Sequence, residues 1–120
     1  MKNKTEKPEP ATPIKLITST GDINIEATQD LLEFSSEQLA KAINIPESHR
    51  SLKECTDKQK ESLKELATAL EIIVAALNND ILKAKYWLKV PNPKFGGTSP
   101  RSLILKGQGQ KVLQFVFSAS

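Results

Sequence analysis

The sequence is poor in the residues that carry most catalytic and metal-binding chemistry. It contains one cysteine, Cys55, and one histidine, His49, in 120 residues. A single cysteine excludes an internal disulfide and favours a reduced, cytoplasmic setting. His49 is more simply interpreted as an exposed polar side chain than as half of a catalytic pair. The sequence Gly107-Gln108-Gly109 lacks the lysine and serine of a phosphate loop and follows a predicted helix. We therefore expect no enzyme activity, no cofactor and no metal.

Long apolar runs are missing as well. The longest, Ile72–Leu77, falls far short of the roughly 20 residues that a membrane span requires. The lysines near Met1 are not followed by an apolar segment, so no secretory signal is expected. With 38% hydrophobic and 26% charged residues, the composition favours a folded, soluble protein without a membrane partner.

Acidic residues are absent from the C-terminal third. From position 83 onward there is no Asp or Glu, whereas between Glu26 and Leu82 acids outnumber bases eleven to six. The basic residues of this stretch are Lys83, Lys85, Lys89, Lys94, Arg101, Lys106 and Lys111. Such a basic region attracts an acidic protein surface, a phosphate-rich ligand or nucleic acid. A solvated face without a partner is the alternative.

The N-terminal quarter carries few helix signals. Residues 1–13 hold lysines and prolines with no large apolar residue after Met1, which is typical of a flexible tail. Residues 14–25 alternate apolar and polar positions around Ser19-Thr20-Gly21-Asp22, which fits either a short hairpin or an extended arm. We therefore divide the chain into a tail or arm (1–25), a helical middle region (26–79) and a C-terminal domain (80–120).

Helical patterns dominate from position 26 onward. A first helix is predicted near Glu26, and a second follows an N-cap at Ser35 or Ser36 and stops at Asn44. The long helix after Thr56 or Asp57 shows the clearest periodicity. Its apolar stripe comprises Leu63, Leu66, Ala67, Leu70, Val74 and Leu77, and its acids Glu61, Glu65 and Glu71 form a solvated face. Ile72 and Ile73 widen the stripe and predict burial on more than one side.

Shorter elements follow the long helix. Asn78-Asn79-Asp80 breaks it and caps a helix over 81–88, in which Trp87 lies beside the buried face. Prolines 91 and 93 and the Gly96-Gly97 pair predict a rigid loop. Ser99-Pro100 then starts a helix that Gly107 ends. A last helix places Val112, Leu113, Val116 and Phe117 on one side. The fold class is therefore all-α.

Residues 36–53 have the outline of a helix-turn-helix. Ala40 would let the two helices approach, Asn44 would make the turn and Ile45 would fill the core. The second helix, starting at position 46 or 47, would present Ser48, His49, Arg50 and Lys53 to DNA. Glu47 at its leading end would face phosphates unfavourably, so a helix-turn-helix kept only as scaffold is weighed equally.

Residues 84–103 resemble the toxin-binding domain of the Xre/MbcA/ParS family of bacterial antitoxins. The resemblance rests on Trp87-Leu88, Pro91-Asn92, Phe95-Gly96-Gly97, Pro100, Leu103, Gly107 or Gly109, and Val112. The order and spacing match over some thirty residues. In that family a helix-turn-helix-like region and a connecting helix precede this domain, so the resemblance extends over roughly residues 30–117.

The resemblance implies an antitoxin that pairs with a RES-domain toxin, a class that attacks cellular NAD. Such an antitoxin neutralises by binding across the toxin's active-site cleft, and many members also bind their own operator DNA. The motif and the acid-free surface beside it together give the expected toxin-binding residues, which are Trp87, Asn92, Lys94, Phe95, Gly96, Gly97, Arg101 and Lys111.

Two other readings of the sequence stay open. The chain could be a stand-alone DNA-binding regulator, or an adaptor that shares only the fold. The apolar surplus at Ile72–Leu77 and the N-terminal arm both suggest a homodimer or a hetero-oligomer.

Overall fold

The computed structural model describes residues 15–45 and 56–119, and within these ranges the chain is helical. The described residues form six α-helices and, beyond two isolated bridges, no strand. The helices are α1 (Ile25–Leu32), α2 (Ser36–Ala42), α3 (Asp57–Ala76), α4 (Ile81–Lys89), α5 (Pro100–Leu105) and α6 (Gln110–Ala119), and a 3-10 turn, η3 (Pro93–Phe95), lies between α4 and α5. The all-α prediction is confirmed.

The helix starts follow local capping chemistry. The Ser35 and Thr56 side chains each accept a hydrogen bond from the N3 backbone amide, and the side-chain oxygen of the glutamine at N3 accepts one from the backbone amide of the cap residue. The Asp80 and Ser99 side chains accept a hydrogen bond from the N3 amides of α4 and α5. Each satisfies a backbone N–H that the helix leaves without an internal partner. These four predicted N-caps are confirmed, with Thr56 and Ser35 selected from the alternatives.

Left-handed backbone conformations follow four of the described helices: α1, where Glu33 has φ +58°, and α2, α3 and α5. Asn44 after α2 has φ +64°, Asn78 and Asn79 after α3 have φ +61° and +60°, and Gly107 after α5 has φ +78°. Asparagine and glycine adopt this region at low cost, which makes them effective helix stops. The predicted ends at these positions are confirmed. The predicted helix starting at 46 or 47 lies outside the described residues.

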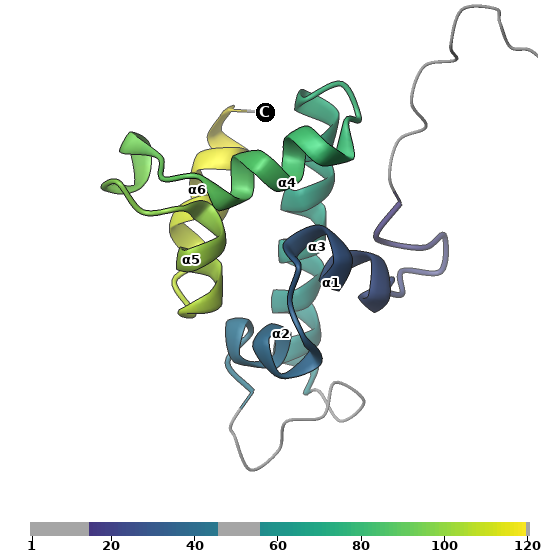
Figure 1. Cartoon of the computed structure of the whole chain (residues 1–120). Coiled ribbons are helices and arrows are strands. Elements are labelled where there is room, and N and C mark those ends of the chain that lie inside the picture. Colours follow the sequence, from purple (N-terminus) through teal and green to yellow (C-terminus); the bar gives the residue numbers. More distant parts are fainter. Residues whose placement is uncertain (1–14, 46–55, 120) are drawn as a thin grey trace, which may run out of the picture.

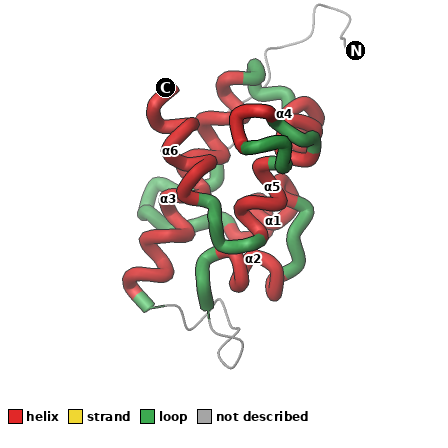
Figure 2. The backbone as a smooth tube through the Cα atoms, turned by 90° about the vertical axis from the view of Figure 1, so that its left-hand side faces the viewer, coloured by secondary structure: helices red, strands yellow, loops and turns green. Residues whose placement is uncertain are grey.

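The long helix α3 is the axis of the molecule (Figure 1). It packs against α6 and α4, while α5 packs against α2, α4 and α6. Figure 2 shows the same helices from the side, with the short loops running between them. Buried leucine, isoleucine, valine and alanine side chains from all six helices form one core. No helix within residues 15–45 and 56–119 has both the length and the apolar character that a membrane crossing needs.

The segment before α1 is fastened to α3. Ile17 and Ile23 form an antiparallel bridge around a turn at Gly21, whose φ is +89°. Leu16 is fully buried. The Glu71 side chain accepts hydrogen bonds from the backbone amides of Leu16 and Ile17, with N···O distances of 2.7 and 3.2 Å. The prediction that Glu71 belongs to a solvated face is therefore wrong, because its carboxylate satisfies two amides of a segment 54 and 55 positions earlier.

The end of α3 is buried on one side only. Ile73 and Val74 are buried, Ile72 and Leu77 are half-buried, and Ala75 and Ala76 are exposed. The prediction that Ile72 and Ile73 widen the stripe is confirmed, since Ile73 is buried and Ile72 packs half-buried against the core. The widening does not reach the side of the helix that carries Ala75 and Ala76, which are exposed.

Candidate functional site

The described residues contain no cluster suited to metal binding. No group of three or more histidine, cysteine, aspartate or glutamate side chains comes together in residues 15–45 and 56–119. The largest concentration of predicted binding residues lies instead at the loop between α4 and α5, which projects from one edge of the bundle (Figure 1).

Asn92 gives this loop its shape. Its backbone amide donates to Thr98 O (3.1 Å), and its own carbonyl accepts from the amides of Phe95 (2.9 Å) and Gly97 (3.0 Å). Its side-chain oxygen accepts from the amide of Lys94 at 2.9 Å. Gly96 and Gly97 close the turn with φ +70° and +83°. Four hydrogen bonds through one residue fix the backbone of the loop, so that its side chains are presented in a defined arrangement.

A row of aromatic rings holds the loop against the bundle. The Trp87 and Phe95 ring centroids are 6.3 Å apart, and those of Phe95 and Phe115 are 5.4 Å apart, both with edge-to-face geometry. Lys94 Nζ lies 5.7 Å from the centroid of the Phe115 ring. The row joins α4 and η3, which follow each other in the chain, to α6, which comes after α5.

A surface hollow lies beside this row. Its volume is about 540 Å³ and its lining combines charged, polar and aromatic side chains. The lining residues are Lys94, Phe95, Gly96, Lys111, Gln114, Phe115 and Ser118. We call this surface the loop–α6 site. The structure thus brings together four of the predicted toxin-binding residues, Lys94, Phe95, Gly96 and Lys111, and places Trp87, Asn92 and Gly97 behind or beside them.

Arg101 does not share the loop–α6 site. Its Nε donates to Leu32 O at 2.6 Å and its Nη2 donates to Glu33 O at 2.7 Å. Its guanidinium carbon lies 4.8 Å from the centroid of the Phe34 ring. Arg101 thereby caps the C-terminus of α1 and stacks on the α1–α2 connection, which favours a structural role for this side chain.

Two other basic residues of the C-terminal third form ion pairs within the molecule. Lys85 pairs with Asp30 at 3.4 Å, and Lys89 pairs with Glu33 at 3.0 Å, both linking α4 to α1. Four basic side chains make no ion pair within residues 15–45 and 56–119: Lys83, Lys94, Lys106 and Lys111. Two of these four, Lys94 and Lys111, line the loop–α6 site, so that site offers two positive charges to a partner.

Three residues of the loop–α6 site come from α6 and were not predicted: Gln114, Phe115 and Ser118. The sequence placed Phe117 on the buried side of α6, but 41% of it is exposed, so that prediction is wrong. Phe115 and Phe117 each lie about a quarter turn from the middle of the stripe formed by Val112, Leu113 and Val116. Helical periodicity therefore does not choose between them; contact with Phe95 makes Phe115 the partly buried one.

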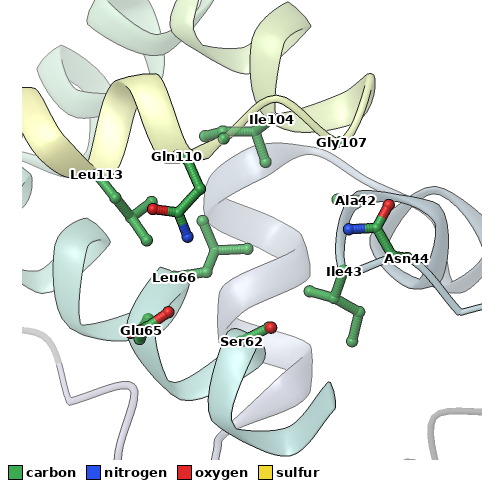
Figure 3. Close-up of a pocket in the computed structure, with 11 residues that line it drawn as sticks. Ala42, Ile43, Asn44, Ser62, Glu65, Leu66, Ile104, Gly107, Gln110 and Leu113 are labelled. Atoms are coloured by element: carbon green, nitrogen blue, oxygen red, sulfur yellow. The ribbon is translucent and has the colours of Figure 1, made fainter. Parts of the chain in front are cut away.

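A second hollow lies where the α2 turn meets α3 and α5 (Figure 3). Asn44, Ser62 and Gln110 surround it together with the apolar side chains of Ile43 and Leu66. Its volume is about 70 Å³, enough for a few water molecules and too small for an organic ligand. We assign no binding function to it.

The predicted DNA-reading residues cannot be placed in the same way. Ser48, His49, Arg50 and Lys53 lie outside the described residues, as does Cys55. The described half of the motif has Ala40 and Ile45 buried and Asn44 in the left-handed region. The helix-turn-helix stays a prediction.

Comparison of the chain with protein-family models, with curated proteins and with solved structures finds no match.

Proposed function

We propose that the protein is the antitoxin of a bacterial toxin–antitoxin pair and that it neutralises a RES-type, NAD-consuming toxin by direct binding. The observation that supports this most is the loop–α6 site. Phe95 and Gly96 belong to the motif that resembles antitoxins, Lys94 and Lys111 were expected from the acid-free surface beside it, and all four line one hollow. A loop that is fixed by Asn92 and presents an aromatic ring between two lysines suits recognition of an acidic protein surface.

Rigidity of the loop supports a binding role over a catalytic one. A loop held by four hydrogen bonds loses little conformational entropy when a partner binds. Lys94 and Lys111 carry no ion pair within the described part of the chain, so a partner carboxylate would not have to displace one. The toxin is therefore expected to contribute acidic residues to the rim of the interface and an apolar or aromatic group to its centre.

Co-purification tests the proposal. The tagged chain is expressed together with the product of the adjacent gene in its operon, which is also expressed alone to assay toxicity. A toxic neighbour that elutes in a stable complex with this chain supports the antitoxin function. A harmless neighbour that does not bind contradicts it.

A charge-reversal pair then tests the site. Lys94→Glu with Lys111→Glu is expected to weaken toxin binding by at least about 100-fold, since like charges across an interface cost several kcal/mol. The matched control is Lys58→Glu with Lys106→Glu, which changes net charge equally at exposed positions outside the site. Equal losses in both pairs would contradict the loop–α6 site. Arg101 is unsuitable for this test because it holds the fold together.

A DNA-binding regulator is the second candidate function. The buried Ala40 and Ile45 and the left-handed Asn44 agree with the first helix and turn of a helix-turn-helix. This function predicts that Arg50→Ala and Lys53→Ala reduce binding to the DNA upstream of the gene. It also predicts a steep loss of affinity as salt rises. Unchanged affinity in both variants would contradict it.

A further inference from the structure

An apolar groove next to the loop–α6 site, with which it shares Phe115, lies between α4 and α6 over the end of α3. Its centre is a hollow of about 210 Å³ lined by apolar side chains, among them Ile72, Ala76, Leu77, Trp87, Phe115 and Ala119. A neighbouring hollow of about 450 Å³ shares Leu77 and Trp87 with it and adds Leu82 and Tyr86. We call the two hollows together the α3–α4–α6 groove.

Two large apolar side chains of the groove are mostly exposed to solvent. Leu82 is 77% exposed and Tyr86 is 69% exposed, and both lie on the outer face of α4. Neighbouring apolar groups left in contact with water are typical of a surface that binds another protein. A cavity of about 150 Å³ accommodates a benzene ring, so the central hollow has room for one large apolar side chain.

The charges around the groove are predominantly positive. Lys83 lies at the α4 end, and Lys94 and Lys111 lie beyond Phe115 at the other end. None of the three makes an ion pair within the described residues. Among the described residues, Asp80 is the one acid that lines the groove, and its carboxylate already accepts a hydrogen bond from the Lys83 amide as the cap of α4.

We infer that the α3–α4–α6 groove docks an amphipathic helix of a partner protein, with an apolar stripe facing the groove and acidic residues toward its two ends. A helix is favoured over a strand because residues 15–45 and 56–119 contain no sheet edge to extend. Leucine-like side chains at i, i+3, i+4 and i+7 would contact Leu77, Trp87 and Leu82. Acidic residues would lie near Lys83 at one end and near Lys94 and Lys111 at the other.

The same charges disfavour the two other occupants that the chain itself could provide. A second copy would bring lysines against lysines across the groove, and like charges at an interface cost several kcal/mol. Residues 1–13 carry three lysines and three prolines and no large apolar residue after Met1. They offer neither an apolar stripe nor a net acidic charge. The inference does not depend on the antitoxin proposal, because the partner helix is defined by its own chemistry.

Fluorescence of Trp87 reports binding in the groove, since Trp87 lines it and is the single tryptophan of the chain. The probe is a synthetic helical peptide of about 18 residues, long enough to hold helical structure, with leucines at i, i+3, i+4 and i+7 and glutamates toward both ends. One control peptide has the same composition without the stripe, and another has lysines in place of the glutamates. We expect saturable binding of the acidic striped peptide with a Kd below about 100 µM, a blue shift of Trp87 emission, and at least about tenfold weaker binding of both controls.

Two neighbouring substitutions locate the binding surface. Ala76→Glu places a bulky acid in the groove, whereas Ala75→Glu places the same side chain at the neighbouring exposed position of α3, which lines none of these hollows. Both put an acid in the last turn of the helix, so their effects on stability should match. Ala76→Glu should weaken the peptide at least about tenfold, and Ala75→Glu by less than about twofold.

Four results would overturn the inference. They are the absence of saturable binding, equal binding of the lysine peptide or of the unstriped peptide, and equal effects of the two alanine variants. The fourth is a dimer in sedimentation experiments that Ala76→Glu dissociates, because a second copy would then occupy the groove.

Discussion

Single side chains fasten together parts of this chain that are distant in sequence. Arg101 on α5 bonds to the carbonyls that end α1, 68 and 69 positions earlier, and stacks on Phe34. A guanidinium has several donors in a fixed plane, so one side chain can satisfy two carbonyls at once. Arg101 therefore ties α5 to the connection between α1 and α2.

We expect Arg101→Ala to lower the free energy of unfolding by about 2–3 kcal/mol, because it leaves two carbonyls without their charged donor. Arg101→Lys should recover only part of the lost free energy of unfolding, since a single ammonium cannot reproduce the planar set of guanidinium donors. Urea unfolding measures both. Lys106→Ala, at an exposed position without an ion pair in the described part of the chain, should change stability by less than about 0.5 kcal/mol. A loss in Arg101→Ala no larger than that in Lys106→Ala would contradict the role of Arg101.

At the scale of elements, α3 organises the segments around it, including the arm at residues 15–24. We expect Glu71→Ala to release that arm and to cost about 1–2 kcal/mol, because two backbone amides lose a charged acceptor. Hydrogen exchange at the Leu16 and Ile17 amides should accelerate at least about tenfold while the core of α3 stays protected. Glu65→Ala on the same helix is the control. Equal exchange at Leu16 in the two variants would contradict the role of Glu71 in holding the arm.

The loop between α4 and α5 depends on the backbone freedom of its glycines. Gly97→Ala should cost about 1–2 kcal/mol, because φ is +83° at this position although there is space for the added methyl group. It should also weaken binding at the loop–α6 site by disturbing the Asn92–Thr98 bridge. Gly109→Ala is the matched control, since its φ is not positive and its added Cβ would only touch Ile104. Thermal unfolding measures the effect. If Gly97→Ala and Gly109→Ala lower Tm equally, this explanation is contradicted.

At the scale of the whole molecule, some lysines of the acid-free C-terminal third join helices and others are left for a partner. Lys85 and Lys89 link α4 to α1, while Lys94 and Lys111 face outward. The double variant Lys85→Gln and Lys89→Gln should lower stability by no more than about 1 kcal/mol, as exposed ion pairs contribute little. Lys94→Gln with Lys111→Gln should leave unfolding unchanged and should weaken the partner complex. Both double variants are tested by urea denaturation and by partner binding. Loss of binding in the Lys85/Lys89 variant, with binding kept in the Lys94/Lys111 variant, would contradict this assignment of roles.

The sequence by itself determined the all-α class and most helix boundaries. Ser35, Thr56, Asp80 and Ser99 act as N-caps through hydrogen bonds that span three residues, and Asn44 and Gly107 end helices through their own backbone conformation. Such interactions are local, so neighbouring residues are sufficient to predict them. The loop residues of the candidate site were found in the same way, from a motif that is contiguous in sequence.

Tertiary structure decided which of these residues meet and which side chains are exposed. Periodicity could not separate Phe115 from Phe117, nor show that Glu71 would hold Leu16 and Ile17 or that Arg101 would face α1. Each of these outcomes depends on a partner that is many positions away in the chain. The positions of Lys94 and Lys111 around one hollow, and the groove beside Trp87, arise because α4 and α6 pack on α3 and Phe95 of η3 packs between Trp87 and Phe115. The spacing of residues within one helix carries no information about that packing.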